Sequence, residues 1–256
     1  MGRERYSEIK KREPMSRLRK EYMAKLVGRC LIFIAGIFLC IAWPSEFELL
    51  NGMNFFGGFS VLHILWGMWV IDMIFQLVPV KGHVPLGSQK LFRERFRPIR
   101  EKINYPSLKR YIISTTKAAY KIFILWAALI AAIGALFYAG ILNKLMVFMI
   151  SVCFYVCDLI CVLIWCPFRL FLKNQCCTTC RIFNWDHLMM FSPLIFMGGF
   201  YSLSLVLTAL VVWAVWELCV FLFPERFWEF SNEGLKCANC TDKLCTQYCR
   251  KLRKQF

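Results

Sequence analysis

The chain has 256 residues, 59% of them hydrophobic, and a formal net charge of +16. A soluble domain is roughly 45–50% apolar, and several apolar runs here reach the ~18–20 residues that cross a bilayer, so the composition excludes an ordinary soluble domain. The basic residues flank the apolar runs, as the positive-inside rule and anionic lipid require. We therefore expect an all-α, polytopic transmembrane helix bundle in the cell membrane, with the lipid bilayer and not nucleic acid as its partner.

The first part of the chain predicts a cytosolic tail and two transmembrane helices. Residues 1–25 form a basic segment, which the positive-inside rule places in the cytosol. Within residues 26–78, the apolar runs Leu26–Trp43 and Asn54–Val78 predict helices 1 and 2, and a proline follows each run. The loop between them, SEFELLNG, has acidic residues and no basic one, so we expect it on the outside.

Residues 79–117 form a long basic connection, which we expect on the cytosolic side. Its apolar residues repeat at helical spacing and predict an amphipathic helix in the membrane interface, interrupted by Pro98. The residues concerned are Phe92, Phe96, Ile99 and Ile103. The alternative is that this loop is a docking surface for a protein partner or an anionic head group.

Residues 118–223 hold the remaining transmembrane helices. The runs Ala118–Ile141 and Leu145–Trp165 predict helices 3 and 4. The last apolar run, from His187 to Phe223, would be roughly 55 Å long as one helix, far longer than the ~30 Å hydrocarbon core. We expect it to divide near the sequence GGFYS into a short, tilted or re-entrant helix 5 and a full helix 6.

The count of six segments agrees with the distribution of charge. Six crossings place residues 224–256, a basic and cysteine-rich tail, in the cytosol with the N-terminus, whereas five would place these basic residues outside. The loop of residues 166–187 between helices 4 and 5 is then cytosolic as well. We therefore expect both termini and both cysteine clusters on the cytosolic side.

The chain has 14 cysteines, and eight of them form the two expected cytosolic clusters. Because the reducing cytosol disfavours stable disulfides, these thiols indicate ligands for a soft metal. A Cys-x2-Cys pair lets two sulfurs bind one ion, and Zn²⁺ takes four ligands. Each cluster could close a site alone, or the two could share one. The candidate ligands are Cys166, Cys176, Cys177, Cys180, Cys237, Cys240, Cys245 and Cys249.

The metal itself stays open between zinc and an iron–sulfur cluster, because the cysteine spacings match neither common ferredoxin pattern. A zinc ion would pin the tail to the loop, whereas an iron–sulfur centre would transfer electrons. A site without metal is a further alternative. Asp186 and His187 follow the loop cluster and could serve as ligands, or they could cap the start of helix 5.

Ionisable and polar residues within the predicted helices are a second group of candidates, since such residues are costly in a membrane and often functional. They are His63, Asp72, Asp158 and Glu217. Asp158 lies deep enough in helix 4 to need a partner. Asp72 and Glu217 lie nearer the interface and could reach water or Arg29, and for His63 we favour a hydrogen-bonded core histidine.

A row of cysteines on helix 4 is open to two interpretations. Cys153, Cys157 and Cys161 are four residues apart, so they share one helix face that leads to Cys166, with Asp158 beside it. One interpretation is a path for a soft metal or for electrons, which would suit a transporter of a soft metal ion or small solute. The other is that these cysteines are small apolar packing residues.

Three blocks in the C-terminal half show a resemblance to a known family. The blocks WCPFRLFLKNQCCTTCRIFNWDHLMMFSPLIF, FPERFWEFSN and CANCTDKLC resemble a family of uncharacterised, Cys-rich integral membrane proteins of bacteria and archaea, and CCxxCRIFNWD is the most distinctive part. The resemblance implies the same Cys-bearing half and no particular activity, and Cys249 departs from the pattern. The sequence also has no phosphate-binding loop, His-Glu-x-x-His or Gly-x-Ser-x-Gly motif, so no catalytic residue is assigned.

Overall fold

The computed structural model describes residues 16–78, 90, 92–100, 102–172 and 177–236. In these residues the chain is helical, with short 3₁₀ turns and no strand. Helix α3 (Val61–Leu77) is apolar and has 17 residues. Four further helices are long and apolar enough to cross a membrane: α2 (Arg17–Ala42), α4 (Tyr105–Tyr138), α5 (Lys144–Leu163) and α8 (Gly199–Leu222). An all-helical chain with several candidate membrane spans is therefore confirmed.

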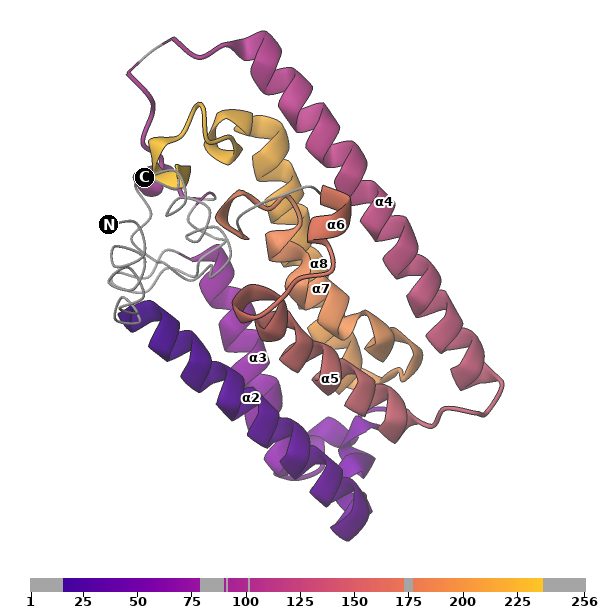
Figure 1. The fold of residues 1–256 in the computed structure, drawn as a ribbon. Helices are drawn as coiled ribbons and strands as arrows, with labels where there is room; N and C mark the ends of the chain where they lie inside the picture. The colour runs from indigo at the N-terminus through magenta and orange to yellow at the C-terminus, as the bar shows by residue number, and fades with distance from the viewer. Residues whose placement is uncertain (1–15, 79–89, 91, 101, 173–176, 237–256) are drawn as a thin grey trace, which may run out of the picture.

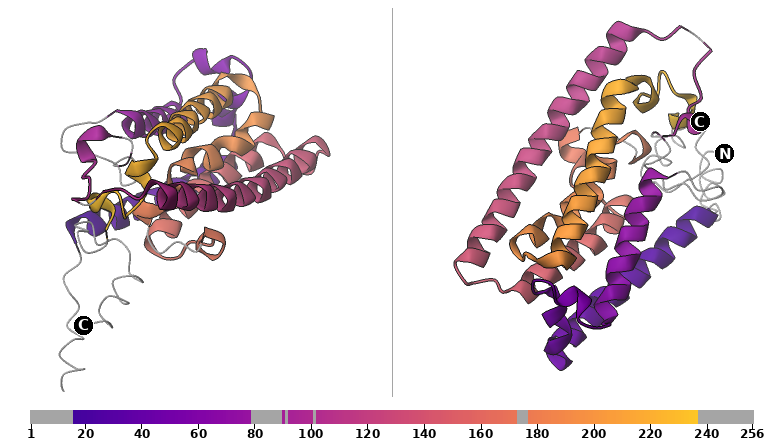
Figure 2. Two further views of the ribbon diagram at one scale, coloured as in Figure 1. Left: turned by 90° about the horizontal axis from the view of Figure 1, so that it is seen from above. Right: turned by 180° about the vertical axis from the view of Figure 1, so that it is seen from behind.

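The long helices lie side by side in one bundle (Figure 1, Figure 2). Helix α2 packs on α5, α3 packs on α8, and α4 runs along the outside. The short helix α7 (Asp186–Phe191) contacts both α5 and α8, and α6 (Arg169–Leu172) packs on α4. The chain between α5 and α8 therefore lies where three long helices meet.

Large aromatic side chains form the main core. Trp69 of α3, Phe148 of α5, Phe191 of α7 and Tyr201 of α8 are fully buried in one cluster. A second cluster joins α4, α8 and the chain after α8 around Trp216. Because helix association in lipid depends on close packing rather than on exclusion of water, these clusters fix the helix positions.

Polar caps set two helix starts that differ from the predicted ones. Ser16 caps α2 by accepting a backbone hydrogen bond, so the helix begins well before the predicted Leu26. Asn104 caps α4 in the same way, ahead of the predicted Ala118. With 34 residues, α4 is about 51 Å long, so it extends beyond the ~30 Å hydrocarbon core. Both helices thus continue through residues assigned to polar segments.

The basic connection before α4 does not form the predicted interfacial helix in its described residues. Helix there is limited to the 3₁₀ turn η4 (Arg93–Arg95), after which Pro98 forms an antiparallel bridge with Asn232. The Glu233 N–H donates to the Arg97 carbonyl at 2.8 Å. Proline lacks an N–H and holds the preceding residue extended, so this backbone pairs with the segment after α8 instead.

The predicted short helix 5 is broken. Helix α7 has six residues and is followed by the 3₁₀ turn η7 (Ser192–Phe196), which contains Pro193. Gly198 and Gly199 then adopt φ angles of +65° and +79°, a conformation that favours glycine. The predicted division of the last apolar run near these glycines is confirmed.

A close backbone contact joins the start of α8 to the loop between α2 and α3. A Cβ atom on Gly199 would lie 2.9 Å from backbone atoms of Gly52, and the Phe200 N–H donates to the Gly52 carbonyl at 2.9 Å. At the start of α5, the Lys144 Nζ donates to Asn51 Oδ1 at 2.6 Å. We call this the glycine end of the bundle, and the opposite end, where α2 begins and α5 finishes, the cysteine end.

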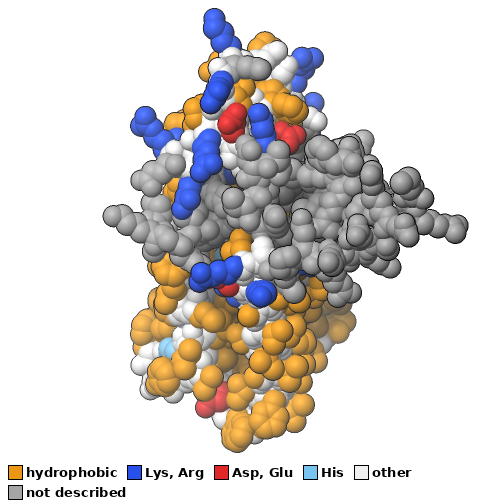
Figure 3. Space-filling view, turned by 60° about the vertical axis from the view of Figure 1, so that its left-hand side comes forward, with side chains coloured by type: hydrophobic (Ala, Val, Ile, Leu, Met, Phe, Trp, Pro, Cys, Tyr) orange, Lys and Arg blue, Asp and Glu red, His pale blue; other side chains and the backbone are white. Residues whose placement is uncertain are grey.

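Charge is concentrated toward the cysteine end. In Figure 3, Lys and Arg side chains gather in the upper part of the face shown, whereas its lower part is hydrophobic. The basic residues of the α2 start, of the loop before α4 and of the first α4 turns are Arg17, Arg19, Lys20, Lys25, Arg93, Arg95, Arg97, Arg100, Lys109, Arg110 and Lys117. The bundle therefore has one strongly basic end and an apolar body.

Candidate functional site

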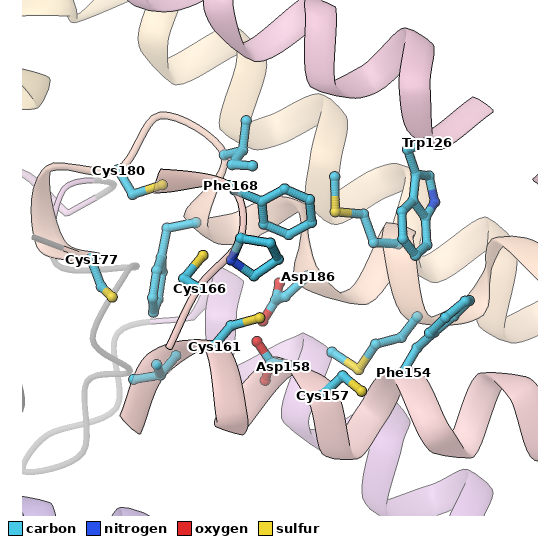
Figure 4. Close-up of a pocket in the computed structure, with 16 residues that line it drawn as sticks. Trp126, Phe154, Cys157, Asp158, Cys161, Cys166, Phe168, Cys177, Cys180 and Asp186 are labelled. Atoms are coloured by element: carbon cyan, nitrogen blue, oxygen red, sulfur yellow. The ribbon is translucent and has the colours of Figure 1, made fainter. Parts of the chain in front are cut away.

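A cavity of about 250 Å³ lies at the cysteine end, between α4, α5, α7 and the loop that joins α5 to α7 (Figure 4). Its aromatic wall includes Trp126 of α4, Phe154 of α5 and Phe168 of the loop. Two carboxylate residues, Asp158 and Asp186, also line it. An apolar cavity with a few polar groups is the usual form of a small-molecule site.

Five cysteines line this cavity. Cys157 and Cys161 lie one turn apart on α5, Cys166 follows the end of that helix, and Cys177 and Cys180 lie on the loop (Figure 4). The fold gathers them because the proline after Cys166 cannot extend the helix and the chain turns back over its end. The cavity thus brings together cysteines from both the membrane helix and the loop.

Cys161 and Cys166 are free thiols and form a hydrogen-bonded pair. Hydrogen bonding from the Cys161 thiol and from the backbone at Phe168 and Arg169 favours the Cys166 thiolate. These hydrogen bonds, and the nearby Arg169 guanidinium, lower the pKa of Cys166 to about 7 against the effect of burial. The same guanidinium lies 3.7 Å from the Cys177 sulfur. Cys166 is therefore the thiol best suited to react as a thiolate.

The predicted metal ligands are described in part. Those that line the cavity are Cys166, Cys177 and Cys180. Those that lie outside the described residues are Cys176, Cys237, Cys240, Cys245 and Cys249. Within the described part of the chain, no three His, Cys, Asp or Glu side chains come together as a metal site. A complete thiolate site would therefore need ligands from beyond the described part.

The row of cysteines on α5 borders two separate hollows of the bundle. Cys157 and Cys161 line the cavity, whereas Cys153 is exposed and borders a groove with Cys40 of α2. Cys153 still interacts with Cys157, so the structure leaves both interpretations of the row open.

Asp158 has the partner that its depth in the membrane requires. The Arg29 Nη1 of α2 donates to Asp158 Oδ2 at 2.7 Å and to the Tyr155 carbonyl at 2.7 Å. The guanidinium also lies over the Tyr155 ring, 3.8 Å from its centre. Asp72 of α3 lies 4.0 Å from the same arginine, as the sequence allowed. Arg29 therefore joins three helices through one buried charge.

Asp186 and His187 extend this network and do not have the predicted capping role. His187 is buried, with Nδ1 3.2 Å from Asp186 and Nε2 3.4 Å from Asp72. Gln76 of α3 donates to Asp186 Oδ2 at 3.1 Å. The side chains bridge to α3 because polar groups at this depth need partners other than water.

Glu217 of α8 pairs with Arg181 of the loop, and the prediction that it could reach Arg29 is wrong. Two nitrogens of Arg181 donate to the two Glu217 oxygens at 2.8 and 2.7 Å. The Trp185 Nε1 donates to the same carboxylate at 2.9 Å, and Trp216 Nε1 donates to the Arg181 carbonyl at 3.0 Å. Arg181 is not among the residues singled out from the sequence, although its position beside an apolar run could have marked it as a partner for Glu217.

His63 is hydrogen-bonded, as predicted, but it lies in the first turn of α3 rather than within the helix. Its Nδ1 accepts from the Ser60 N–H at 2.9 Å, and its Nε2 lies 2.8 Å from the Phe55 carbonyl oxygen. Ser60 and His63 together cap α3, so the helix begins after the predicted Asn54. His63 thus stabilises a helix start at the glycine end, far from the cavity.

No family model, curated protein or solved structure matches this chain.

Proposed function

We propose that this chain is an integral protein of the cell membrane that crosses the bilayer six times and has both ends in the cytosol. In this proposal it holds a thiolate metal centre, zinc or iron–sulfur, at its cytosolic end. One observation carries the proposal: the loop cysteines and the chain that leads into the cysteine-rich tail lie at the same end of the bundle.

The ends of the described chain support an even number of crossings. The first turns of α2 pack in one cluster with Cys177 and Phe183 at the cysteine end, and the segment after α8 lies at that end too (Figure 1). In this proposal the four long helices and the shorter α3 account for five crossings. Together α7 and η7 give about 19 Å of helix, so a sixth crossing of the ~30 Å core also needs the turns that flank them.

The charge distribution supports a cytosolic cysteine end. Basic side chains gather at the cysteine end. The α2–α3 loop at the glycine end has two acidic residues, Glu46 and Glu48, and the basic Lys144 lies at the start of α5 at that end. Basic residues are retained on the cytosolic side of membrane proteins. In the basic loop, Arg93, Arg95, Arg97 and Arg100 are exposed, which suits a protein partner at the same face.

Packing places the start of the tail near the loop cysteines. Cys180 belongs to the same hydrophobic cluster as Phe227, which follows α8. Between them, the buried Lys90 donates to the Cys180 carbonyl at 3.1 Å. The described chain continues to Lys236, and Cys237 is the next residue. The described chain therefore ends, one residue before the first tail cysteine, at the end of the bundle where the loop cysteines lie.

Two Cys-x2-Cys pairs would supply four thiolates, the number that a zinc or iron–sulfur centre takes. We assign these to Cys177 and Cys180 of the loop and Cys237 and Cys240 of the tail, with the neighbouring tail and loop cysteines as substitutes. Cys166 is left out because its sulfur is engaged by Cys161. A zinc ion would fasten the tail to the loop, and an iron–sulfur cluster would make this end an electron-transfer site.

Metal analysis with an absorption spectrum tests the proposal on the full chain, purified anaerobically in detergent. We expect either zinc in a colourless sample or iron with acid-labile sulfide and broad visible absorption. The paired variants Cys177→Ser/Cys180→Ser and Cys237→Ser/Cys240→Ser should each lose the metal. Cys219→Ser on α8 is the matched control and should keep it. A wild-type protein without metal, or metal retained in both paired variants, contradicts the proposal.

A second candidate is a transporter of a soft metal ion or small solute. The observation that favours it is the cavity itself, which Asp158 and Asp186 line together with Cys157 and Cys161. Uptake of Ag⁺ into proteoliposomes should fall in the variant Cys157→Ala/Asp158→Asn and persist in Cys153→Ala, because Cys153 lies outside the cavity. Equal uptake by the two variants contradicts this candidate.

A further inference from the structure

The thiol pair at the cysteine end differs from the proposed metal ligands in its surroundings. Cys161 and Cys166 line the same aromatic-walled cavity and lie close together in it (Figure 4). Among the described residues no third ligand completes a metal site around them. Two adjacent thiols at an apolar cavity form a dithiol that a single oxidation step can close into a disulfide.

We propose that Cys161 and Cys166 form a redox-active dithiol that reduces a lipophilic quinone bound in the adjacent cavity. The proposal is independent of the metal centre, since neither cysteine belongs to the assigned ligand set.

The local structure provides what such a dithiol requires. Cys166 follows the end of α5, and the turn before α6 brings its sulfur within hydrogen-bond reach of Cys161 on the last turns of the helix. Hydrogen bonding from the backbone at Phe168 and Arg169 favours the Cys166 thiolate. Cys161 then acts as the resolving thiol, the arrangement found at redox-sensitive cysteines.

The cavity matches the size and chemistry of a quinone ring. Its volume of about 250 Å³ is small and suits one ring rather than an extended cofactor. The rings of Trp126, Phe154 and Phe168 provide faces and edges for a flat aromatic ligand. Mainly apolar walls disfavour a charged or strongly polar substrate, because its hydration would be lost without replacement.

The position of the cavity gives a lipophilic ligand a route from the bilayer. Cys157 lines the cavity and is exposed on the outer side of α5, so the cavity reaches the surface of the bundle there. Trp126 of α4 forms part of the wall across from this helix (Figure 4). A ring can therefore occupy the cavity while an apolar tail passes out between α4 and α5 into lipid.

The reaction is a balanced two-electron exchange. The two S–H bonds of Cys161 and Cys166 break and one S–S bond forms, so the dithiol loses two electrons and two protons. The quinone gains both, and its two C=O groups become the two C–OH groups of a hydroquinone. Restoring the dithiol would require electrons from a second thiol couple on the cytosolic side.

Anaerobic reaction of the full chain with decylubiquinone tests the proposal. The protein is placed in nanodiscs with its thiols reduced and freed of reductant. We expect one hydroquinone for every two thiols lost, with a disulfide between Cys161 and Cys166 in the peptide map. Cys161→Ser and Cys166→Ser should each slow quinone reduction about tenfold or more, and the matched control Cys153→Ser should keep the wild-type rate.

A binding measurement keeps the test informative if a single variant is unstable. The double variant Cys161→Ser/Cys166→Ser should still bind decylubiquinone in equilibrium dialysis, because the cavity wall is unchanged, and should reduce none. Val162→Phe, which places a larger side chain at the cavity wall, should weaken binding. A disulfide that maps to other cysteines, or wild-type rates in Cys161→Ser, overturns the proposal.

The same assay separates this proposal from the metal centre. The variant Cys177→Ser/Cys180→Ser should lose metal and still reduce quinone at the wild-type rate. Loss of quinone reduction in that variant, with Cys161 and Cys166 intact, would assign the reaction to the loop cysteines and overturn the present inference. Absence of metal with normal quinone reduction would overturn the metal centre alone.

Discussion

Two buried arginines bind carboxylates in this bundle, and they do so in different ways. Arg181 is 5% exposed and forms a two-pronged pair with Glu217 at 2.7 and 2.8 Å. Arg29 donates to one oxygen of Asp158 at 2.7 Å and lies 4.0 Å from Asp72. Arg181 and Glu217 form a closed pair, in which one positive charge faces one negative charge. Arg29 instead belongs to an open group, in which more than one carboxylate lies near the guanidinium.

The difference lies in how the negative charge is neutralised. Around Arg29 and His187, three carboxylates meet, those of Asp72, Asp158 and Asp186. Asp158 and Asp186 also line the cavity. A closed pair can hold a loop in place, whereas a group with surplus carboxylates can respond to a proton or cation that enters beside it. We therefore regard Arg181 as structural and the Arg29 group as part of the site.

The largest effect is expected from Arg181→Met, which leaves the half-buried Glu217 without its arginine partner. Such a change costs about 3–5 kcal/mol, so the free energy of unfolding in an SDS titration should fall by that amount. The double variant Arg181→Met/Glu217→Gln is the control and should recover most of the loss, because no charge is then left unpaired. A loss below about 1 kcal/mol in the single variant would show that the pair is not needed for stability.

A smaller effect is expected from Arg29→Met, at about 3 kcal/mol in the same titration, the lower end of the range for a buried charge that loses its partner. Asp72 is 42% exposed and can use water, and His187 remains beside it. Arg29→Lys keeps the charge without the fork of donors and should lose less than Arg29→Met. A loss equal to that of Arg181→Met would remove the distinction between the closed pair and the open group.

Gln76→Leu should cost about 1 kcal/mol, the usual net value of one hydrogen bond. The change removes the donor to Asp186 but leaves the charges around Arg29 intact. Gln76→Glu has a similar shape and adds a like charge beside Asp186, so it should destabilise the protein more than Gln76→Leu. The reverse order would mean that this position is neutralised by water or by a bound cation.

The smallest effect concerns the reactivity of the Cys166 thiol at the cavity. Because hydrogen bonds lower the pKa of Cys166 to about 7, its alkylation by iodoacetamide in metal-free protein should rise with pH to half its maximum near pH 7. Cys161→Ala removes the leading donor, so the pKa should rise and the rate at pH 7 should fall several-fold. Peptide mass spectrometry follows the site. A midpoint near the ordinary thiol value of ~8.5 contradicts the arrangement.

The long helices could be predicted from the sequence because apolar runs of spanning length have few alternatives in lipid. The division before α8 followed from the same length argument. The starts of α2 and α4 could not be placed, since Ser16 and Asn104 cap the first turns of these helices by hydrogen bonds that hydropathy does not measure. The extended chain near Pro98 escaped the prediction because its partner, around Asn232, is remote in sequence.

The candidate site was predictable in its composition but not in its pairing. The gathering of Cys166, Cys177 and Cys180 at one end was expected, and the cavity brings them together. The Cys161–Cys166 contact was not expected, because it depends on how the chain turns after α5. Likewise, Arg29 and Asp158 are 129 residues apart, and only the packing of α2 on α5 makes them neighbours.

The contact between Gly199 and Gly52 has a mechanical consequence. There is no room for even a methyl group between α8 and the α2–α3 loop. The start of α8 is therefore held against the α2–α3 loop at the glycine end. Any tilt between α8 and the α2–α3 pair therefore pivots about this contact and displaces these helices most at the cysteine end. The cavity lies between α4, α5 and α7, so a ligand there acts on these helices and not on the fastened pair.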